Sequence, residues 1–236
     1  GIPYIEAEND EDAWYGAGFC QGQDRAFQIE SMARVARGTL SELVGRPGLP
    51  VDRLARQVGF SRGTSEQLGV IDPDIRRTLD AFARGVTDGM TLGSKKRAHE
   101  FVLLRVKPTP YTAQDVLAVG RLQAFVLALN WDIELARYHI LQMDGPQALA
   151  DLDPTYPEWH PVTSPPGSAQ GPMADRLASD MGALRDVIGY SGGSNNWAVA
   201  GSLTPTGRPL LANDPHLRPS LPPHWYLTQS PPATTE

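Results

Sequence analysis

Hydrophobic positions recur at helical spacing along most of the first 150 or so residues. The clearest run begins at Asp10, where Asn9 can cap a helix, and continues through Val35 until Gly38 ends it. Three acidic residues in its first turn suit the positive end of a helix dipole. Similar patterns predict further helices at Leu40 to Val44, Asp52 to Gln57, Asp74 to Met90, Ala98 to Leu104, Ala113 to Leu129, Ile133 to Met143 and Met173 to Ile188.

Stretches with strand character are few and lie near the two ends of the chain. One is residues 2–6 (IPYIE), and two more are residues 196–200 (NWAVA), just after Ser194, and residues 210–212. Residues 154–171 are rich in Pro, Gly, Ser and Thr, a composition that builds neither a core nor a regular ladder. We therefore divide the chain into a helical region at 1–153, a spacer at 154–193 and a strand-bearing region at 194–236.

The composition is that of an ordinary globular protein, with 41% hydrophobic and 20% charged residues. Because 27 acidic residues outweigh 21 basic ones and no basic cluster occurs, nucleic acid is not an expected partner. The single cysteine, Cys20, excludes an internal disulfide, a CxxC redox pair and a thiolate zinc cluster, and we expect it to be a small buried residue.

Two features bear on location. No apolar stretch is long enough to span a bilayer, so no membrane partner is expected. The chain opens with Gly1 rather than Met, as it would after removal of a secretory leader, although another boundary would leave the same end. A periplasmic or secreted location is expected, with a cytoplasmic one left open.

Ser194 is the candidate nucleophile. A serine hydroxyl needs a base, and neither a GxSxG elbow nor an SxxK pair supplies one here. If the bond between Gly193 and Ser194 is cut, the new α-amino group, with a pKa of about 7.7 to 8.0, can serve as that base. Gly193 also tolerates strained backbone and leaves its carbonyl open to attack. From the residues alone, a flexible turn ending in a polar cap is the simpler interpretation.

Four blocks of sequence change that balance. They are residues 1–45, 107–120 (KPTPYTAQDVLAVG), 192–201 (GGSNNWAVAG) and 207–217 (GRPLLANDPHL). In this order they resemble the penicillin acylase family of N-terminal nucleophile (Ntn) hydrolases, and among these the motifs are most similar to cephalosporin and acyl-homoserine-lactone acylases. The first block departs from the usual form at residues 32–37 (MARVAR), a minor variation.

The resemblance implies a precursor that cuts itself before Ser194 and so separates a helical small subunit from a larger catalytic one. The expected fold is α+β, with a mostly helical N-terminal region, a spacer and the first strands of an incomplete α-β-β-α sandwich. Gly193 and Ser194 would be the processing site, and Asn195, Asn196 and Trp197 would line the active site. The implied substrate is a small acyl amide, and the implied partner is a large β subunit.

His216, in the block LLANDPHL, is the second candidate catalytic residue. Composition alone favours a surface or turn histidine beside Pro215. In the family branch that resembles cephalosporin and acyl-homoserine-lactone acylases, however, a histidine in this motif assists the nucleophile. The resemblance therefore favours aliphatic or dicarboxylic acyl amides as substrates.

Polar residues also interrupt the first long helix. Gln23, Asp24, Arg25 and Gln28 sit within an otherwise apolar periodicity. We expect them to form an internal salt-bridge or hydrogen-bond network rather than to take part in catalysis.

Glu134 is the candidate metal ligand. The resemblance matches it to a residue that binds a structural calcium ion in several family members, with Asp132 as the alternative. Calcium takes six to eight oxygen ligands, and those expected to complete the site lie beyond residue 236. An ordinary ion pair between Glu134 and Arg137, three residues apart on a helix, is the simpler interpretation. No cofactor is expected for catalysis itself.

The resemblance covers only about the front third of the family's usual length. The asparagine that completes the oxyanion hole and the arginine that orients the nucleophile's amine would lie in the remaining part. Since one lost oxyanion donor costs about 10²–10³ in rate, we expect the 236 residues alone to be inactive. The alternative from another class is a non-catalytic fragment, which acts as a scaffold or needs a separate large subunit.

Overall fold

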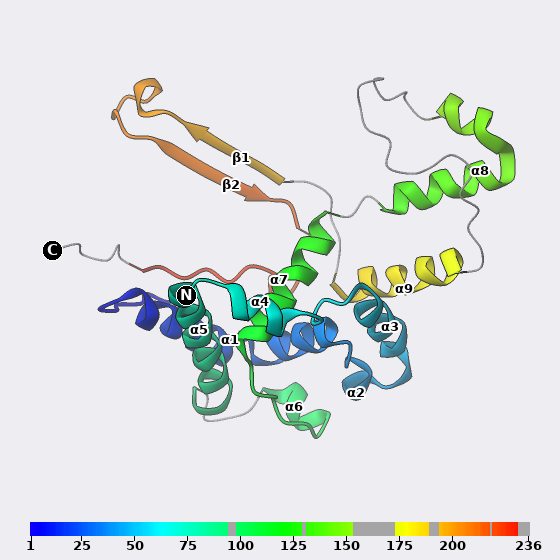
Figure 1. The fold of residues 1–236 in the computed structure, drawn as a ribbon. Coiled ribbons are helices and arrows are strands. Elements are labelled where there is room, and N and C mark those ends of the chain that lie inside the picture. Colours follow the sequence, from blue (N-terminus) through cyan, green and yellow to red (C-terminus); the bar gives the residue numbers. More distant parts are fainter. Residues whose placement is uncertain (94–97, 129–130, 153–172, 189–193, 218, 231–236) are drawn as a thin grey trace.

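The computed structural model describes residues 1–93, 98–128, 131–152, 173–188, 194–217 and 219–230, which form helices followed by one β-hairpin (Figure 1). The hairpin pairs β1 with β2 and stands apart from the helices in the view. The elements are α1 (Asp10–Arg37), α2 (Ser41–Val44), η1 (Arg46–Gly48), α3 (Leu49–Val58), α4 (Thr64–Val70), α5 (Pro73–Leu92), α6 (His99–Leu103), α7 (Ala113–Leu127), α8 (Trp131–Leu152), α9 (Met173–Ile188), β1 (Ser194–Val199), η2 (Gly201–Leu203) and β2 (Leu210–Pro215).

Helices α1 and α5 form the most extensive helix pair of the described residues. Gly18 and Gly22 on α1 face Gly85 and Gly89 on α5, and the two glycines of each helix are four positions apart. A Cβ atom at any of these four positions would collide with a backbone carbonyl of the partner helix. The absence of side chains therefore lets the two backbones come into direct contact, and no larger residue fits without moving a helix.

The main apolar core joins α1, α3, α7 and α9. Helix α9 contributes Met181 and Leu184 to it, both almost fully buried. The Asp180 carboxylate of the same helix is 2% exposed and accepts two hydrogen bonds from Arg53 of α3, at 3.1 and 2.5 Å. The remaining core residues are Val35, Ala36, Leu40, Val51, Leu54, Ala55, Phe60, Ala118, Leu122 and Val126.

A network of charged groups ties the end of α1 to the segment before α7. Glu30 is buried, pairs with Arg34 at 2.6 Å and accepts the Thr109 backbone N–H at 2.9 Å. Arg37 donates to Asp115 at 2.6 Å. Burial alone would raise the pKa of Asp115, but hydrogen bonds from Arg37 and from the helix cap outweigh it and hold that pKa below its ordinary value.

The predicted helices are confirmed, with differences in detail. Helix α4 was not predicted, because its seven residues follow a left-handed glycine, Gly63, and are too few to show a clear period. Helix α8 runs on to Leu152 across a break at Gly145, whose φ of 81° interrupts the helical geometry. Residues 2–6 form no strand of their own, and only Tyr4 makes a bridge, to Gln229.

The hairpin is exposed on both faces. Strands β1 and β2 are antiparallel, with Ser194 opposite Pro215 at one end and Val199 opposite Leu210 at the other. Large apolar side chains lie open to solvent, with Trp197 at 66% and Leu211 at 74% exposure. A hairpin of two strands is marginally stable without further packing.

Two further predictions can be compared with the structure. Within the described part of the chain, none of the helices combines the length and the apolar character that crossing a bilayer requires. Cys20 is a free thiol that is only partly buried, and this burial raises its pKa above the ordinary value.

Candidate active site

Ser194 is the first residue of β1, the position that the sequence predicted for a nucleophile at the start of a strand. Its side chain is exposed, and the antiparallel register places it opposite Pro215. Strand geometry alternates side chains between the two faces of a sheet, so Asn196 shares the face of Ser194 while Asn195 and Trp197 take the other. Gly193 lies outside the described residues, and so does the bond between it and Ser194.

A row of polar groups lies beside Ser194 at the same end of the hairpin. The Asn195 side-chain nitrogen is 3.4 Å from Nε2 of His216. On the other side of the ring, Nδ1 of His216 is 3.4 Å from an oxygen of Asp214. A carboxylate next to Nδ1 favours the tautomer that carries the proton there, which leaves Nε2 as an acceptor for the Asn195 amide.

Asp214 was not among the predicted site residues. The sequence did not indicate its place, because the strand was predicted to end at residue 212, whereas β2 continues to Pro215 and His216 directly follows it. The structure thus brings Ser194, Asn195, Asp214 and His216 to one end of the hairpin. The catalytic roles of Ser194 and His216 stay predictions, as do the lining roles of Asn195, Asn196 and Trp197.

A cavity of about 440 Å³ is lined in part by residues that follow β2 in the sequence. It is bounded by the last residues of α9, including Ile188, and by Leu217, which directly follows His216. Apolar side chains of α1 and α7, such as Met32 and Val126, form its wall. His224 also lines it, and burial lowers the pKa of this histidine below its ordinary value. Its lining mixes apolar side chains with polar ones such as Gln123 and Asp186, as in pockets that bind small molecules.

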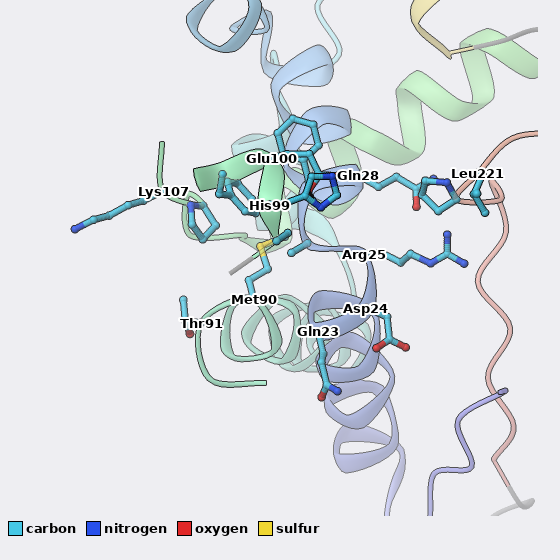
Figure 2. Close-up of a pocket in the computed structure, with 16 residues that line it drawn as sticks. Gln23, Asp24, Arg25, Gln28, Met90, Thr91, His99, Glu100, Lys107 and Leu221 are labelled. Carbon is cyan, nitrogen blue, oxygen red and sulfur yellow. Dashed lines mark ion pairs between the residues drawn. The ribbon is translucent and has the colours of Figure 1, made fainter. Parts of the chain in front are cut away.

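A second cavity of about 530 Å³ lies among α1, α5 and α6 (Figure 2). Figure 2 shows Arg25 and Gln28 of α1 extending toward Leu221, while Lys107 extends away on the opposite side. His99 and Glu100 of α6 lie 3.6 Å apart in its wall. Neither cavity is lined by Ser194 or His216, and we prefer the first as the candidate site because Leu217, the residue after His216, lines it.

The polar residues of α1 do form hydrogen bonds, but with a distant partner. Arg25 and Gln28 both donate to the backbone carbonyl of Pro223, each at 3.3 Å, and Asp24 accepts from the Tyr226 hydroxyl at 2.6 Å. The sequence predicted a network of Gln23, Asp24, Arg25 and Gln28, and the last three of these form such hydrogen bonds. Its partners, however, are residues near the end of the chain rather than neighbouring helices.

Glu134, the predicted calcium ligand, lies on α8. Its carboxylate pairs with Arg137 at 2.7 Å, the arrangement expected of two residues three apart on a helix. Among the residues that the structure describes, no three His, Cys, Asp or Glu side chains gather to hold a metal ion. The side chain of Asp132 lies outside this description. The residues described do not by themselves form a calcium site, and the role of Glu134 stays a prediction.

The sequence matches the family model for penicillin amidase over residues 1–231, which include the hairpin and both ends of the helical region. The chain belongs to the penicillin amidase family. The match spans all four blocks from which the resemblance was drawn, and with them Ser194 and His216.

Curated relatives of this penicillin amidase family member carry two kinds of name. The acyl-homoserine lactone acylase QuiP of Pseudomonas aeruginosa is 32% identical over 237 residues, which cover 97% of this chain and 28% of the relative. The penicillin acylase 2 proenzyme of Pseudomonas sp. strain SE83 is 31% identical over 229 residues, which cover 92% of this chain and 29% of the relative. The chain therefore spans less than a third of the length of these two proteins.

Among solved structures, the family member resembles a thermostable penicillin G acylase from Alcaligenes faecalis. The TM-score is 0.52 at 21% sequence identity, and the superposition covers 67% of this chain and 91% of the other. At this identity the likeness establishes a shared fold. Together with the family match, it confirms the predicted fold class and marks the chain as belonging to a family of amide hydrolases.

Proposed function

We propose that this chain is the front part of an acylase precursor, which cuts itself before Ser194 and then hydrolyses linear amides with the new N-terminal serine. The observation that carries the proposal is that β1 begins at Ser194, inside the region matched by the penicillin amidase family model. The names of the relatives, a lactone acylase and a penicillin acylase proenzyme, support both the amide chemistry and the processing.

The proposed self-cleavage needs no added base beyond the local groups. The Ser194 hydroxyl attacks the carbonyl carbon of Gly193, and the acyl group moves from the Ser194 nitrogen to its oxygen. The nitrogen takes up the hydroxyl proton as the C–N bond breaks. Water then hydrolyses the ester, which releases a carboxylate at Gly193 and a free α-amino group on Ser194.

In the hydrolytic step the same residue supplies nucleophile and base. The neutral α-amino group of Ser194 accepts the hydroxyl proton while the oxygen attacks the substrate carbonyl. The amine part of the substrate leaves with that proton, and water hydrolyses the acyl ester. His216, held between Asn195 and Asp214, assists by orienting polar groups at the end of the strand.

The proposed substrate is an acyl amide whose acyl chain enters the cavity of about 440 Å³. Met32 and Val126 provide apolar contacts for that chain, and Asp186 is the acidic residue among the described residues that line the cavity. The relatives' names give two amine partners to test, a homoserine lactone and a β-lactam nucleus.

Mass spectrometry of the purified chain tests the proposed cleavage. We expect a fragment that ends at Gly193 and another that begins at Ser194. Ser194→Ala should abolish this cleavage, because it removes the attacking oxygen. Ser202→Ala is the matched control, since Ser202 lies in the same exposed region and should leave cleavage intact. Cleavage that survives Ser194→Ala would disprove the assignment.

The second candidate is an inert scaffold that lacks activity or pairs with a separate large subunit. The chain spans less than a third of the length of the two relatives, and for this reason the scaffold should be tested together with the proposed acylase. A panel of penicillins, glutaryl cephalosporins and acyl-homoserine lactones should be offered to the chain alone and to the full-length precursor. A single intact species with no turnover in either case would favour the scaffold.

A further inference from the structure

Helix α6 ends in a turn that carries three exposed apolar side chains. Val102, Leu103 and Leu104 are all exposed, Leu103 to 76%. Successive residues of a helix are rotated by about 100°, so these side chains spread over the outer side of the turn. Phe101, the residue before them, is buried and meets the Phe27 ring of α1 edge-on, with the ring centres 5.4 Å apart. The turn is therefore anchored by its inner residue and apolar on its outside.

The backbone at the end of this turn has a conformation that glycine normally supplies. The Val106 N–H donates to the Phe101 carbonyl at 3.1 Å. The Arg105 N–H donates to the Val102 carbonyl at 3.3 Å, which completes a Schellman motif, in which the residue at the position of Arg105 is most often glycine. Arg105 has a φ of 56°, and it is the one non-glycine residue with a positive φ in the described part of the chain. A large cation thus stands where a side chain costs stability, directly after the exposed apolar residues.

Contrary to the expectation drawn from the overall charge of −6, basic residues gather around this turn. Residues 95–107 include five basic residues and one acidic residue. Three of the five, at 95–97, lie outside the described residues, while Arg105 and Lys107 are exposed. Figure 2 shows Lys107 extending away from the cavity behind α6. An apolar tip with a local excess of positive charge matches the surface of a bilayer that contains anionic lipids.

The place of α6 in the fold keeps this turn apart from the candidate active site. Figure 1 shows α6 at the lower edge of the helices and the hairpin above them. Strands that continue the sheet would pair along the open edges of β1 and β2, on the hairpin's side of the helices. The described residues that line the cavity of about 440 Å³ include none from α6. A partner bound at the turn would therefore leave the hairpin and that cavity open.

We infer that the outer turn of α6, Val102 to Arg105, is a contact with an anionic membrane surface. Its apolar side chains insert among the lipids, while Arg105 and Lys107 bind the phosphates of the headgroups. The sequence predicted no membrane partner because it holds no spanning stretch, but contact with one face of a bilayer requires only a short apolar tip with basic neighbours. The inference does not depend on the proposed amide hydrolysis.

Co-sedimentation with lipid vesicles tests the contact, both for the 236-residue chain and for the full-length precursor. We expect both to bind vesicles of mixed phosphatidylcholine and phosphatidylglycerol, and to bind vesicles of phosphatidylcholine alone much more weakly. Leu103→Ser should weaken binding to the mixed vesicles roughly tenfold, because an apolar side chain that enters the lipid is lost. Val70→Ser is the matched control, since Val70 on α4 is also exposed but lies outside the turn, and it should leave binding unchanged.

Arg105→Gly separates a lipid contact from a purely structural role. Glycine adopts a φ of 56° without strain, so the variant should melt at the same temperature as the original chain or higher. Loss of the charge should nevertheless weaken binding to the mixed vesicles about fivefold. Arg208→Gln, which removes an exposed basic residue far from α6 in the sequence, should leave both quantities unchanged.

Three results would overturn the inference. The first is equal vesicle binding by the original chain, Leu103→Ser and Arg105→Gly. The second is binding by the 236-residue chain that the full-length precursor lacks, because the rest of the precursor would then cover the turn. The third is self-association that Leu103→Ser abolishes, without any vesicle binding, which would assign the turn to a second copy of the chain. Ser194→Ala should bind vesicles like the original chain, so failure of the proposed cleavage leaves this test intact.

Discussion

The α1–α5 pair and the β1–β2 hairpin are opposite in how they are held. In the helix pair, backbone lies on backbone through four glycines, and each helix completes the surface of the other. In the hairpin, apolar side chains such as Trp197 and Leu211 lie open on both faces. The helical region therefore contains most of its own packing partners, whereas the hairpin presents catalytic candidates on a frame that needs neighbours.

The comparison also shows where each region tolerates change. At a close backbone contact the smallest added group meets a carbonyl that cannot move aside, so tolerance is low. On an exposed strand the same group meets solvent, so the stability of the folded state changes little. The close packing thus lies in the helices, while the candidate catalytic residues lie on the exposed hairpin.

The largest effect is expected from filling the helix contact. Gly22→Ala or Gly85→Ala should lower the free energy of unfolding by about 1–3 kcal/mol, because the new methyl group collides with the partner backbone. Thermal or denaturant unfolding followed by circular dichroism measures the change.

Gly120→Ala is the control for that experiment. Gly120 lies inside α7 with no atom near the position of an added Cβ, so alanine should be neutral or stabilising by about 0.5–1 kcal/mol. If all three variants had the same stability, the close contact between α1 and α5 would not be a source of rigidity.

A smaller effect is expected at the charged network, and it should depend on pH. The pKa of Asp115 is lower in the folded chain than in the unfolded one, so its contribution is present above the ordinary aspartate pKa of about 3.9 and is lost as pH falls through the folded value. Asp115→Asn should lower stability by about 1 kcal/mol at neutral pH, with the difference shrinking below about pH 4.

Thermal unfolding of the original chain and of Asp115→Asn between pH 3 and pH 7 checks this expectation. The difference in their free energies of unfolding should be about 1 kcal/mol at most. Asp74→Asn is the control, because Asp74 forms an exposed ion pair with Arg77 on a single helix. A stability difference for Asp115→Asn that stays constant across the range would contradict the proposed linkage.

The smallest effect is expected on the hairpin. Trp197→Ala should change the unfolding of the helical region by less than about 0.5 kcal/mol, since the ring is 66% exposed. Unfolding monitored at α-helical wavelengths measures it. A large loss of helical stability would show that the hairpin packs on the helices more closely than its exposure indicates.

Much of the fold was predictable because its signals are local. The capped start of α1 and the bounds of α9 follow from residues a few positions apart, and the strand after Ser194 was predicted from its composition. The contact between Gly22 and α5 was not, because periodicity does not show which glycine faces another helix. The partner of Asp24, Tyr226, was missed for a similar reason, since the two are 202 residues apart.

The site was predictable only in part. The residues allowed Ser194 to be a nucleophile, and the resemblance to the family made this interpretation the preferred one. The contact between His216 and Asp214 was missed because the strand was expected to end at residue 212, whereas β2 runs to Pro215 and His216 directly follows it. The cavity beside Ile188 and Leu217 depends on how α9 and the chain after β2 lie on α1 and α7, which no local pattern encodes.

The packing of helix α9 determines which pieces would stay together if the chain is cut as proposed. Because Met181 and Leu184 are buried in the main core and Asp180 is bound by Arg53, a second cut between residues 153 and 172 would not by itself detach the helix. Three bands on a denaturing gel would then come from one particle under native conditions. Loss of the α9 peptide from that particle would remove Met181 and Leu184 from the main core and open part of that core to water, which favours aggregation.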